Sequence, residues 1–391
     1  MFEEFSSSIE FQMSLLLFVS LAGYLLAARI NQSAVIGEIL VGLIIGPSVL
    51  GWITYTDFIS SVAHLGAIIL LFVVGLQFKL FDIFKPKYFP IALAGVIVPW
   101  IFGYYVAQFF DFNFASAVFV GTALTATSIA ITAQVLYEMG HLKSEAAKAI
   151  IGAAVIDDVL GLLALSVADS IVVGDFSAMS FGLLVLKAVL FIGIGAFIGM
   201  RWISMLVRKM DTSKIAKKYP EFVFIFAMLF AFLYAMGAEL IGLSAIVGAF
   251  IAGVALENVS VVNSKSFKEG AEYLHIIFAA IFFVSLGILA DFHALTLDIM
   301  WFLIALTVVA ILSKLVACGL CAKMIGMSWK ESAIIGIGMS PRGEVAMIVA
   351  LIGLNQGLIG QGIYVSLILM SLFTTVFTPI ALRRLLVQKN N

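Results

Sequence analysis

The sequence predicts an all-α polytopic membrane protein with about 13 transmembrane helices. Of its 391 residues, 63% are hydrophobic and only 12% are charged, and the mean hydropathy is +1.17. Soluble domains of ordinary composition carry about twice that share of charge, so a water-soluble fold is excluded. Apolar stretches recur at short intervals along the chain. Each is about 18 residues or longer, enough to cross about 30 Å of hydrocarbon as a helix.

Clusters of charge, prolines and glycines divide the chain into the predicted spans. The first span follows the acids Glu3, Glu4 and Glu10 rather than a basic leader, and we interpret it as retained and not as a signal peptide. We expect no soluble regulatory domain between or after the spans. They lie near 9–28, 34–51, 59–78, 88–110, 113–136, 146–171, 179–207, 220–237, 241–256, 273–290, 298–323, 331–354 and 358–384.

The basic residues predict the orientation in the membrane. They fall at the ends that follow odd-numbered spans, whereas the opposite ends carry acids such as Asp57, Asp111 and Asp298 and neither lysine nor arginine. By the positive-inside rule, we expect the N-terminus outside and the C-terminus in the cytoplasm, in a multi-pass protein of the cell (inner) membrane. The basic residues concerned are Arg29, Lys79, Lys85, Lys87, Lys143, Lys148, Arg201, Arg208, Lys209, Lys214, Lys217, Lys218, Lys265, Lys268, Lys323, Lys330, Arg383, Arg384 and Lys389.

Two predicted spans carry signals for an interrupted helix. Residues 121–129, Gly-Thr-Ala-Leu-Thr-Ala-Thr-Ser-Ile, offer hydroxyls that can bond freed backbone groups. Residues 336–344, Gly-Ile-Gly-Met-Ser-Pro-Arg-Gly-Glu, include Pro341, which removes a backbone donor. The two spans occupy corresponding places in two halves of about six helices and run in opposite directions, a plan of inverted repeats with discontinuous crossing helices. The alternative is a proline kink with packing threonines. The polar residues expected at the crossing are Thr125, Thr127, Ser128 and Ser340.

Two adjacent acids, Asp157 and Asp158, lie inside a predicted span, where ionisable residues are costly and mark ion or proton paths. Neighbours on a helix point about 100° apart, so one carboxylate can face a cation while the other faces a basic side chain. Carboxylic acids that are held away from water and repel one another release protons closer to neutral pH. The pair therefore predicts a site that binds either a monovalent cation, with Na⁺ the first choice, or protons. A structural staple is the alternative, and two adjacent buried charges make an expensive one.

Other ionisable residues within the spans extend this prediction. Lys314 is the natural partner of the acids, since a buried lysine can give up a proton when its carboxylate takes a cation; a structural ion pair is the alternative. Arg342 and Glu344 follow the predicted break and are expected to support it, as a local ion pair or by contact with aspartates of other helices. Glu38 either reaches the cytoplasmic face or lines an entrance, and Lys187 extends to the headgroups.

Other function classes fit the sequence less well, and we expect neither an enzyme nor a bound cofactor. Cys318 and Cys321 lie in an apolar stretch without nearby histidines, and we interpret them as buried apolar residues rather than as zinc ligands. An intramembrane aspartyl protease needs aspartates from separate helices, whereas Asp157 and Asp158 are neighbours on one. A passive channel favours weaker binding than a buried acid pair with a basic partner.

These motifs resemble the cation:proton antiporter-2 family, which includes NapA-type Na⁺/H⁺ and Kef-type K⁺/H⁺ antiporters. The resemblance covers nearly the whole chain. The aspartate pair is similar to NapA, because Kef-type proteins usually have glutamine at the position of Asp157 and carry a C-terminal nucleotide-binding domain. The matching pieces are residues 37–51, 71–77 and 282–287, the Thr-Ala-Thr-Ser segment, Asp157 and Asp158, Lys314, and residues 340–344.

The resemblance implies one sodium/proton exchanger domain over residues 1–391, with an NhaA/NapA-like fold. It implies a mobile core at about 88–171 and 298–384, a scaffold that forms a homodimer at about 9–78 and 220–290, and a linker span at about 179–207. It further implies elevator-like alternating access, in which Asp158 binds Na⁺ or Li⁺ and Asp157 pairs with Lys314. More than one proton then returns per cation, so the exchange is electrogenic. K⁺/H⁺ exchange of the Kef type is the alternative.

Overall fold

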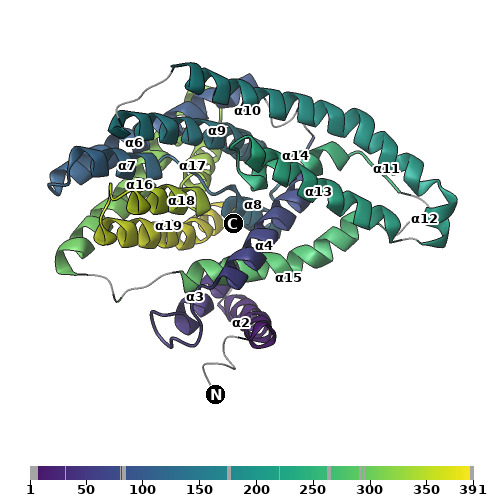
Figure 1. Ribbon diagram of the computed structural model, residues 1–391, viewed down its shortest axis with the longest axis horizontal. Coiled ribbons are helices and arrows are strands. Elements are labelled where there is room, and N and C mark those ends of the chain that lie inside the picture. The colour runs from purple at the N-terminus through teal and green to yellow at the C-terminus, as the bar shows by residue number, and fades with distance from the viewer. Residues whose placement is uncertain are drawn as a thin grey trace. The chain divides into compact units, whose positions relative to one another are not determined.

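A computed structural model describes residues 8–30, 32–79, 81, 85–173, 178–219, 221–261, 266–289, 293 and 296–387, and every regular element within these ranges is a helix (Figure 1). Among the described residues, 8 helices are long and apolar enough to cross a membrane, and shorter apolar helices accompany them. The predicted all-helical class is therefore confirmed, while the number of about 13 crossings stays a prediction.

Each predicted span overlaps a helix or a pair of helices. The single spans correspond to α2 (Ile9–Arg29), α3 (Ala34–Ile45), α4 (Asp57–Gly75), α6 (Phe89–Phe109), α9 (Glu145–Val173), α13 (Phe222–Leu240), α14 (Ala245–Leu256), α15 (Phe267–Ile288), α16 (Leu297–Met324) and α19 (Gln361–Val387). The span near 179–207 corresponds to α10 (Ala178–Ile198), a π-helical turn (Gly199–Ile203) and α11 (Ser204–Asp211), followed by the short α12 (Lys214–Lys218).

Two predicted boundaries are wrong by nearly two turns. The span predicted to begin near residue 273 begins as a helix at Phe267, because this helix includes the charged Lys268, Glu269 and Glu272. The span predicted to reach residue 51 ends as a helix at Ile45, and residues 46–50 form a turn. Pro47 gives the physical reason, because the residue before a proline avoids helical dihedrals and the proline has no N–H to continue the helix. Gly51, at a φ of 62°, completes the turn in a conformation that favours glycine.

Both predicted interruptions are confirmed. The span near 113–136 consists of α7 (Phe114–Ala123) and α8 (Ile129–Glu138), and the span near 331–354 consists of α17 (Trp329–Gly338) and α18 (Glu344–Asn355). The N-termini of the first half-helices are well capped: the Asn113 side chain accepts from the Ser116 N–H, and Ser328 and Glu331 form a capping box. The start of each first half-helix is therefore stabilised by its N-cap, and the helix ends in the middle of the predicted span, at Ala123 or at Gly338.

The chain packs as two compact units, each described by itself. One comprises Met1–Ile59, Lys85–Ala178 and Phe283–Asn391, and the other Ser60–Phe84 and Met179–Phe282. The second unit has an apolar core of α4, α13, α14 and α15 residues in which small side chains allow close contact, as where Gly253 lies against the backbone of Phe72 and Gly75. This division concerns packing, so the predicted scaffold, core and linker, which concern movement, stay a prediction.

The first unit holds both interrupted helices. In it α16 packs along α6, α17 and α19 pack on α16, and α7 contacts α6 and α18 (Figure 1). Glycines bring the interrupted helices close to the long ones: a Cβ on Gly121 would lie 2.7 Å from the Trp100 carbonyl oxygen, and Gly336 lies against the backbone of Leu315. The long helices therefore hold the two interruptions at the centre of this unit.

Candidate ion-binding site

The two interruptions bond directly to one another. The N–H of Ser128 donates to the carbonyl oxygen of Pro341 at 2.8 Å, and the hydroxyl of Thr132 donates to that of Gly338 at 2.6 Å. The Thr127 hydroxyl reaches the Met339 carbonyl at 3.5 Å. Backbone groups freed by one break are thus satisfied by the other, as a break inside a membrane requires.

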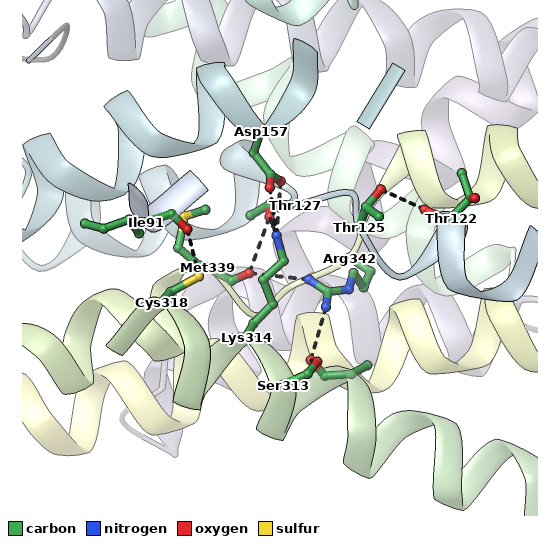
Figure 2. A network of polar contacts seen from close by, with 11 residues as sticks. Ile91, Thr122, Thr125, Thr127, Asp157, Ser313, Lys314, Cys318, Met339 and Arg342 are labelled. Atoms are coloured by element: carbon green, nitrogen blue, oxygen red, sulfur yellow. Dashed lines mark hydrogen bonds and ion pairs between the residues drawn. The ribbon is translucent and has the colours of Figure 1, made fainter. Parts of the chain in front are cut away.

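A buried ion pair lies beside this crossing. The Nζ of Lys314, on α16, donates to the two carboxylate oxygens of Asp157, on α9, at 2.9 and 3.1 Å. It also donates to the Thr127 hydroxyl at 2.7 Å, as Figure 2 shows. The Asp157 and Lys314 side chains are both 0% exposed. The structure therefore contains the predicted pairing, while the part that each residue takes in transport stays a prediction.

Asp158 lies next to this pair and is also buried, with 6% of its surface exposed. As the next residue on α9 it points about 100° away from Asp157, and the three hydrogen bonds of the Lys314 amine go to Asp157 and Thr127 instead. The hydroxyl of Thr125 lies 3.6 Å from where a Cβ on Gly161 would be, about one turn further along α9. The two adjacent acids therefore have different surroundings.

Arg342 is fully buried in the second interruption. Its guanidinium donates to the carbonyl oxygen of Ala310 at 3.1 Å and to that of Met339 at 3.4 Å, while Nε has no hydrogen-bond partner within the described part of the chain. Its backbone is held by α19, through Thr374 and Thr375 at 3.0 Å each. The Glu344 side chain lies outside the described residues, so the predicted local ion pair stays a prediction.

The remaining predicted residues do not all meet at the ion pair. Thr125 and Ser340 donate to carbonyls of their own segments, those of Thr122 and Gly336, at 2.8 Å each. Glu38 is buried in α3, and the hydrogen bonds of the ion pair go to other residues. Of the hydroxyl residues predicted at the crossing, Thr127 therefore touches the ion pair and Ser128 joins the two breaks through its backbone.

Several residues that build this site were not predicted from the sequence. Thr132 and the threonines of α19 bond the second interruption, although Thr132 lies in a helix and not in a break. A Cβ on Gly95, in α6, would lie 3.2 Å from the Lys314 Nζ and 2.9 Å from the Cys318 sulfur. The α19 residues could have been predicted as part of the site, because hydroxyl side chains recur at helical spacing in this otherwise apolar span. They are Ser371, Thr374, Thr375 and Thr378, and all four are buried in the structure.

Comparisons with known proteins concern the whole chain. Residues 15–388 match a family model described as the transmembrane sodium/hydrogen exchanger. The chain is 34% identical over 371 residues to the Na⁺/H⁺-K⁺ antiporter GerN of Bacillus cereus, covering 94% of each chain. It is 32% identical over 373 residues to a Na⁺/H⁺ antiporter of Enterococcus hirae, covering 94% of this chain and 96% of that one.

A solved structure also matches over the full length. It is that of a sodium proton antiporter from Methanocaldococcus jannaschii, with a TM-score of 0.68 and 16% sequence identity, covering 99% of this chain and 100% of that one. At this level of identity the likeness shows the fold, which is that of the solved antiporter.

Proposed function

Because the chain belongs to the sodium/hydrogen exchanger family, we propose that it exchanges Na⁺ or Li⁺ for protons across a cell membrane through the Asp157, Asp158 and Lys314 site. The observation that carries this proposal is the fully buried Asp157–Lys314 ion pair beside a second buried acid. The family predicted from sequence motifs is confirmed at this level. The finer NapA-type label goes beyond the relatives, whose printed names include both Na⁺ and K⁺.

The chemistry rests on competition between cation and protons. In the proposed step, a cation reaching Asp158 displaces the proton held there, and Asp157 turns from Lys314 to the cation. The Lys314 amine, left in an apolar surrounding without its carboxylate, releases its proton. Two protons then leave for one cation bound, and the return of the empty site takes them up again. This exchange moves one net charge per cycle and is electrogenic.

We propose that the ion-binding site opens to the two sides of the membrane in turn by movement between the predicted core and the predicted scaffold. In this proposal the segments at about 88–171 and 298–384 move as a core against a dimeric scaffold at about 9–78 and 220–290. The contacts that support a rigid core are those of the crossing: Ser128 to Pro341, Thr132 to Gly338 and Arg342 to Ala310. They join both interruptions to α16, so the ion pair and the crossing travel together.

The direct test is cation-driven proton movement in proteoliposomes that hold a pH gradient. We expect Na⁺ and Li⁺ to dissipate the gradient in the wild type and Asp158→Asn to abolish the response. A response to K⁺ alone would favour the second candidate, K⁺/H⁺ exchange, which the name of GerN brings into consideration. No proton movement with any of the three cations would exclude the proposed function.

The electrogenic step has its own test. An imposed potential of about 100 mV changes the free energy of moving one charge by about 2.3 kcal/mol. We therefore expect the initial rate of Na⁺-driven proton movement to change several-fold when the sign of the imposed potential is reversed. A rate that is the same at both signs would show a one-for-one exchange and contradict the release of the Lys314 proton.

A further inference from the structure

Glu138 joins two helices that are distant in the sequence. It lies in the last turn of α8, and its Oε2 accepts hydrogen bonds from the Ser33 hydroxyl at 2.6 Å and from the Ala34 N–H at 3.3 Å, where α3 begins. The side-chain amide of Gln134 donates to the other oxygen at 3.1 Å. One carboxylate thus connects positions that are 105 residues apart.

The negative charge of Glu138 is unfavourable at the C-terminus of its own helix, α8, and favourable at the N-terminus of α3. An acid near a helix C-terminus meets the negative end of the helix dipole, whereas an acid at an N-terminus meets the positive end and unpaired N–H groups. Ser33, the N-cap of α3, makes no side-chain hydrogen bond to its own helix. At the N-caps of α7, α12, α16 and α17, by contrast, the side chain accepts from its own helix. Glu138 therefore serves as the cap of α3.

The other end of α8 forms the crossing. Helix α8 has 10 residues, a length of about 15 Å. At its start, Ser128 and Thr132 bond the second interruption through Pro341 and Gly338. A contact that fixes Glu138 therefore also fixes the position of the crossing relative to α3.

Two ionisable side chains of other helices lie near this contact. Glu38 lies one turn into α3 from Ala34 and is 6% exposed; its side chain leans toward the helix N-terminus, where Glu138 sits. Arg383 of α19 acts on Glu138 as an opposite charge. Glu138 and Arg383 line the same cavity of ≈ 890 Å³. The hydrogen bonds from Ser33 and Ala34 and the opposite charge of Arg383 therefore hold Glu138 at the start of α3.

We propose that Glu138 is a positioning residue for transport, whose contact with Ser33 and Ala34 is a latch between α8 and α3 that opens and closes once in each cycle. This inference rests on the proposed function, in which α8 belongs to the moving core and α3 to the scaffold. The latch lies at the end of the spans where the basic residues gather, which the positive-inside rule assigns to the cytoplasm. Its opening frees α8, and with it the crossing beside the ion pair.

The decisive experiment locks the latch reversibly. Ser33→Cys and Glu138→Cys are combined, purified in proteoliposomes and treated with a short thiol cross-linker that reductant cleaves; mass spectrometry measures the linked fraction. We expect Na⁺-driven proton movement to fall about tenfold or more on linking and to return on reduction. The wild type, which carries Cys318 and Cys321, and the two single variants receive the same treatment, and the rate of each after treatment is expected to equal its own rate before treatment.

Each result distinguishes the latch from the function on which it rests. An untreated wild type without exchange would refute the proposed function itself. If the wild type transports and the linked double variant transports equally well, α8 and α3 do not separate and the latch is refuted. Failure of the two cysteines to link in the folded protein would refute their juxtaposition, and with it the latch.

Two substitutions give an independent readout without added thiols. Glu138→Ala removes the latch, and we expect it to change the apparent Na⁺ affinity measured from the cytoplasmic side about tenfold; Glu138→Gln keeps an acceptor for Ser33 and is expected to restore most of the difference. Glu331→Gln is the matched control, because Glu331 lines the same cavity but bonds Ser328 within its own capping box. An affinity equal to that of the wild type in Glu138→Ala would overturn the proposal.

Discussion

At the scale of one residue, the surroundings of Lys314 bear on the proposed role of this site. Its three ammonium protons have three acceptors, the two oxygens of Asp157 and the hydroxyl of Thr127. Burying such a pair gives little net stability, because the loss of hydration offsets most of the attraction. A helix that needed only stability would carry apolar residues there. The buried charges therefore favour the proposed proton-releasing role of this site.

The pairing predicts how stability responds to neutralisation. Asp157→Asn leaves the Lys314 charge buried without a counter-charge, and we expect it to lower the free energy of unfolding by about 3–5 kcal/mol. The double variant Asp157→Asn/Lys314→Met removes both charges and is expected to recover most of that loss. Thermal unfolding of the purified protein in detergent measures the difference. If the double variant were no more stable than the single one, the two side chains would not be paired in the folded protein.

Gly95 gives a second prediction at this scale. A methyl group there would lie 3.2 Å from the Lys314 Nζ and 2.9 Å from the Cys318 sulfur, so Gly95→Ala pushes on an amine that three hydrogen bonds hold in place. We expect an exchange rate lowered about tenfold, the effect of about 1.4 kcal/mol of strain. Gly193→Ala in α10, where a methyl group meets nothing within 4 Å, is the control. Equal rates in both variants would show that Lys314 moves aside freely.

At the scale of elements, the interruptions were predictable but their mutual bonds were not. The glycine and hydroxyl residues at 121–129 and Pro341 indicated where the spans break, because those residue types satisfy or remove backbone hydrogen bonds locally. Which hydroxyl crosses to the other span depends on the rotation of α8 against α17, and no local pattern encodes it. Thr132 makes that bond from inside α8, whereas Thr125 and Ser340, which lie at the breaks, bond their own segments.

The bond from Thr132 leads to a prediction about the crossing. Thr132→Val keeps the shape of the side chain but leaves the Gly338 carbonyl without its 2.6 Å partner, at a cost of about 1–3 kcal/mol for a buried unsatisfied group. Thr307→Val is the control, since the Thr307 hydroxyl donates to the Leu303 carbonyl of its own helix at 2.8 Å. Thermal unfolding of both variants in detergent measures this. An unfolding temperature in Thr132→Val equal to that of the control would show that the crossing does not depend on this bond.

The contact of Glu138 with α3 could not be predicted from local sequence patterns either. Glu138 is an acid at the end of a predicted span, and no residue near it in the sequence indicated Ser33 as a partner. The exchange of capping groups between two helices is a tertiary feature, because it requires the end of α8 and the start of α3 to meet. Sequence patterns with a period of one helical turn report the neighbours on the same helix, not those on another.

At the scale of the whole molecule, composition and the spacing of charge carried most of the prediction. Long apolar stretches gave the helices, and their bounds agree with the structure to within a few residues except at the end of α3, which Pro47 stops early, and at the start of α15, which begins at Phe267 and not near residue 273. The family motifs gave the antiporter fold, which the likeness to the solved structure confirms. Movement between core and scaffold, and dimerisation, depend on weak contacts that composition does not encode, so both stay proposals.

The alternation of basic residues makes a prediction for the intact cell. Val49, exposed in the turn that follows α3, belongs to the ends without lysine or arginine, and Lys217, exposed in α12, to the basic ends. By the positive-inside rule, a cysteine at Val49 is expected to react with a membrane-impermeant maleimide added to intact cells, and a cysteine at Lys217 only after permeabilisation. The wild type gives the background from Cys318 and Cys321. The opposite labelling pattern would invert the orientation, place the Glu138 latch outside and require proton release from Lys314 on the other side. Labelling of both positions in intact cells would mean that an odd number of crossings does not separate them, and the span count would have to change.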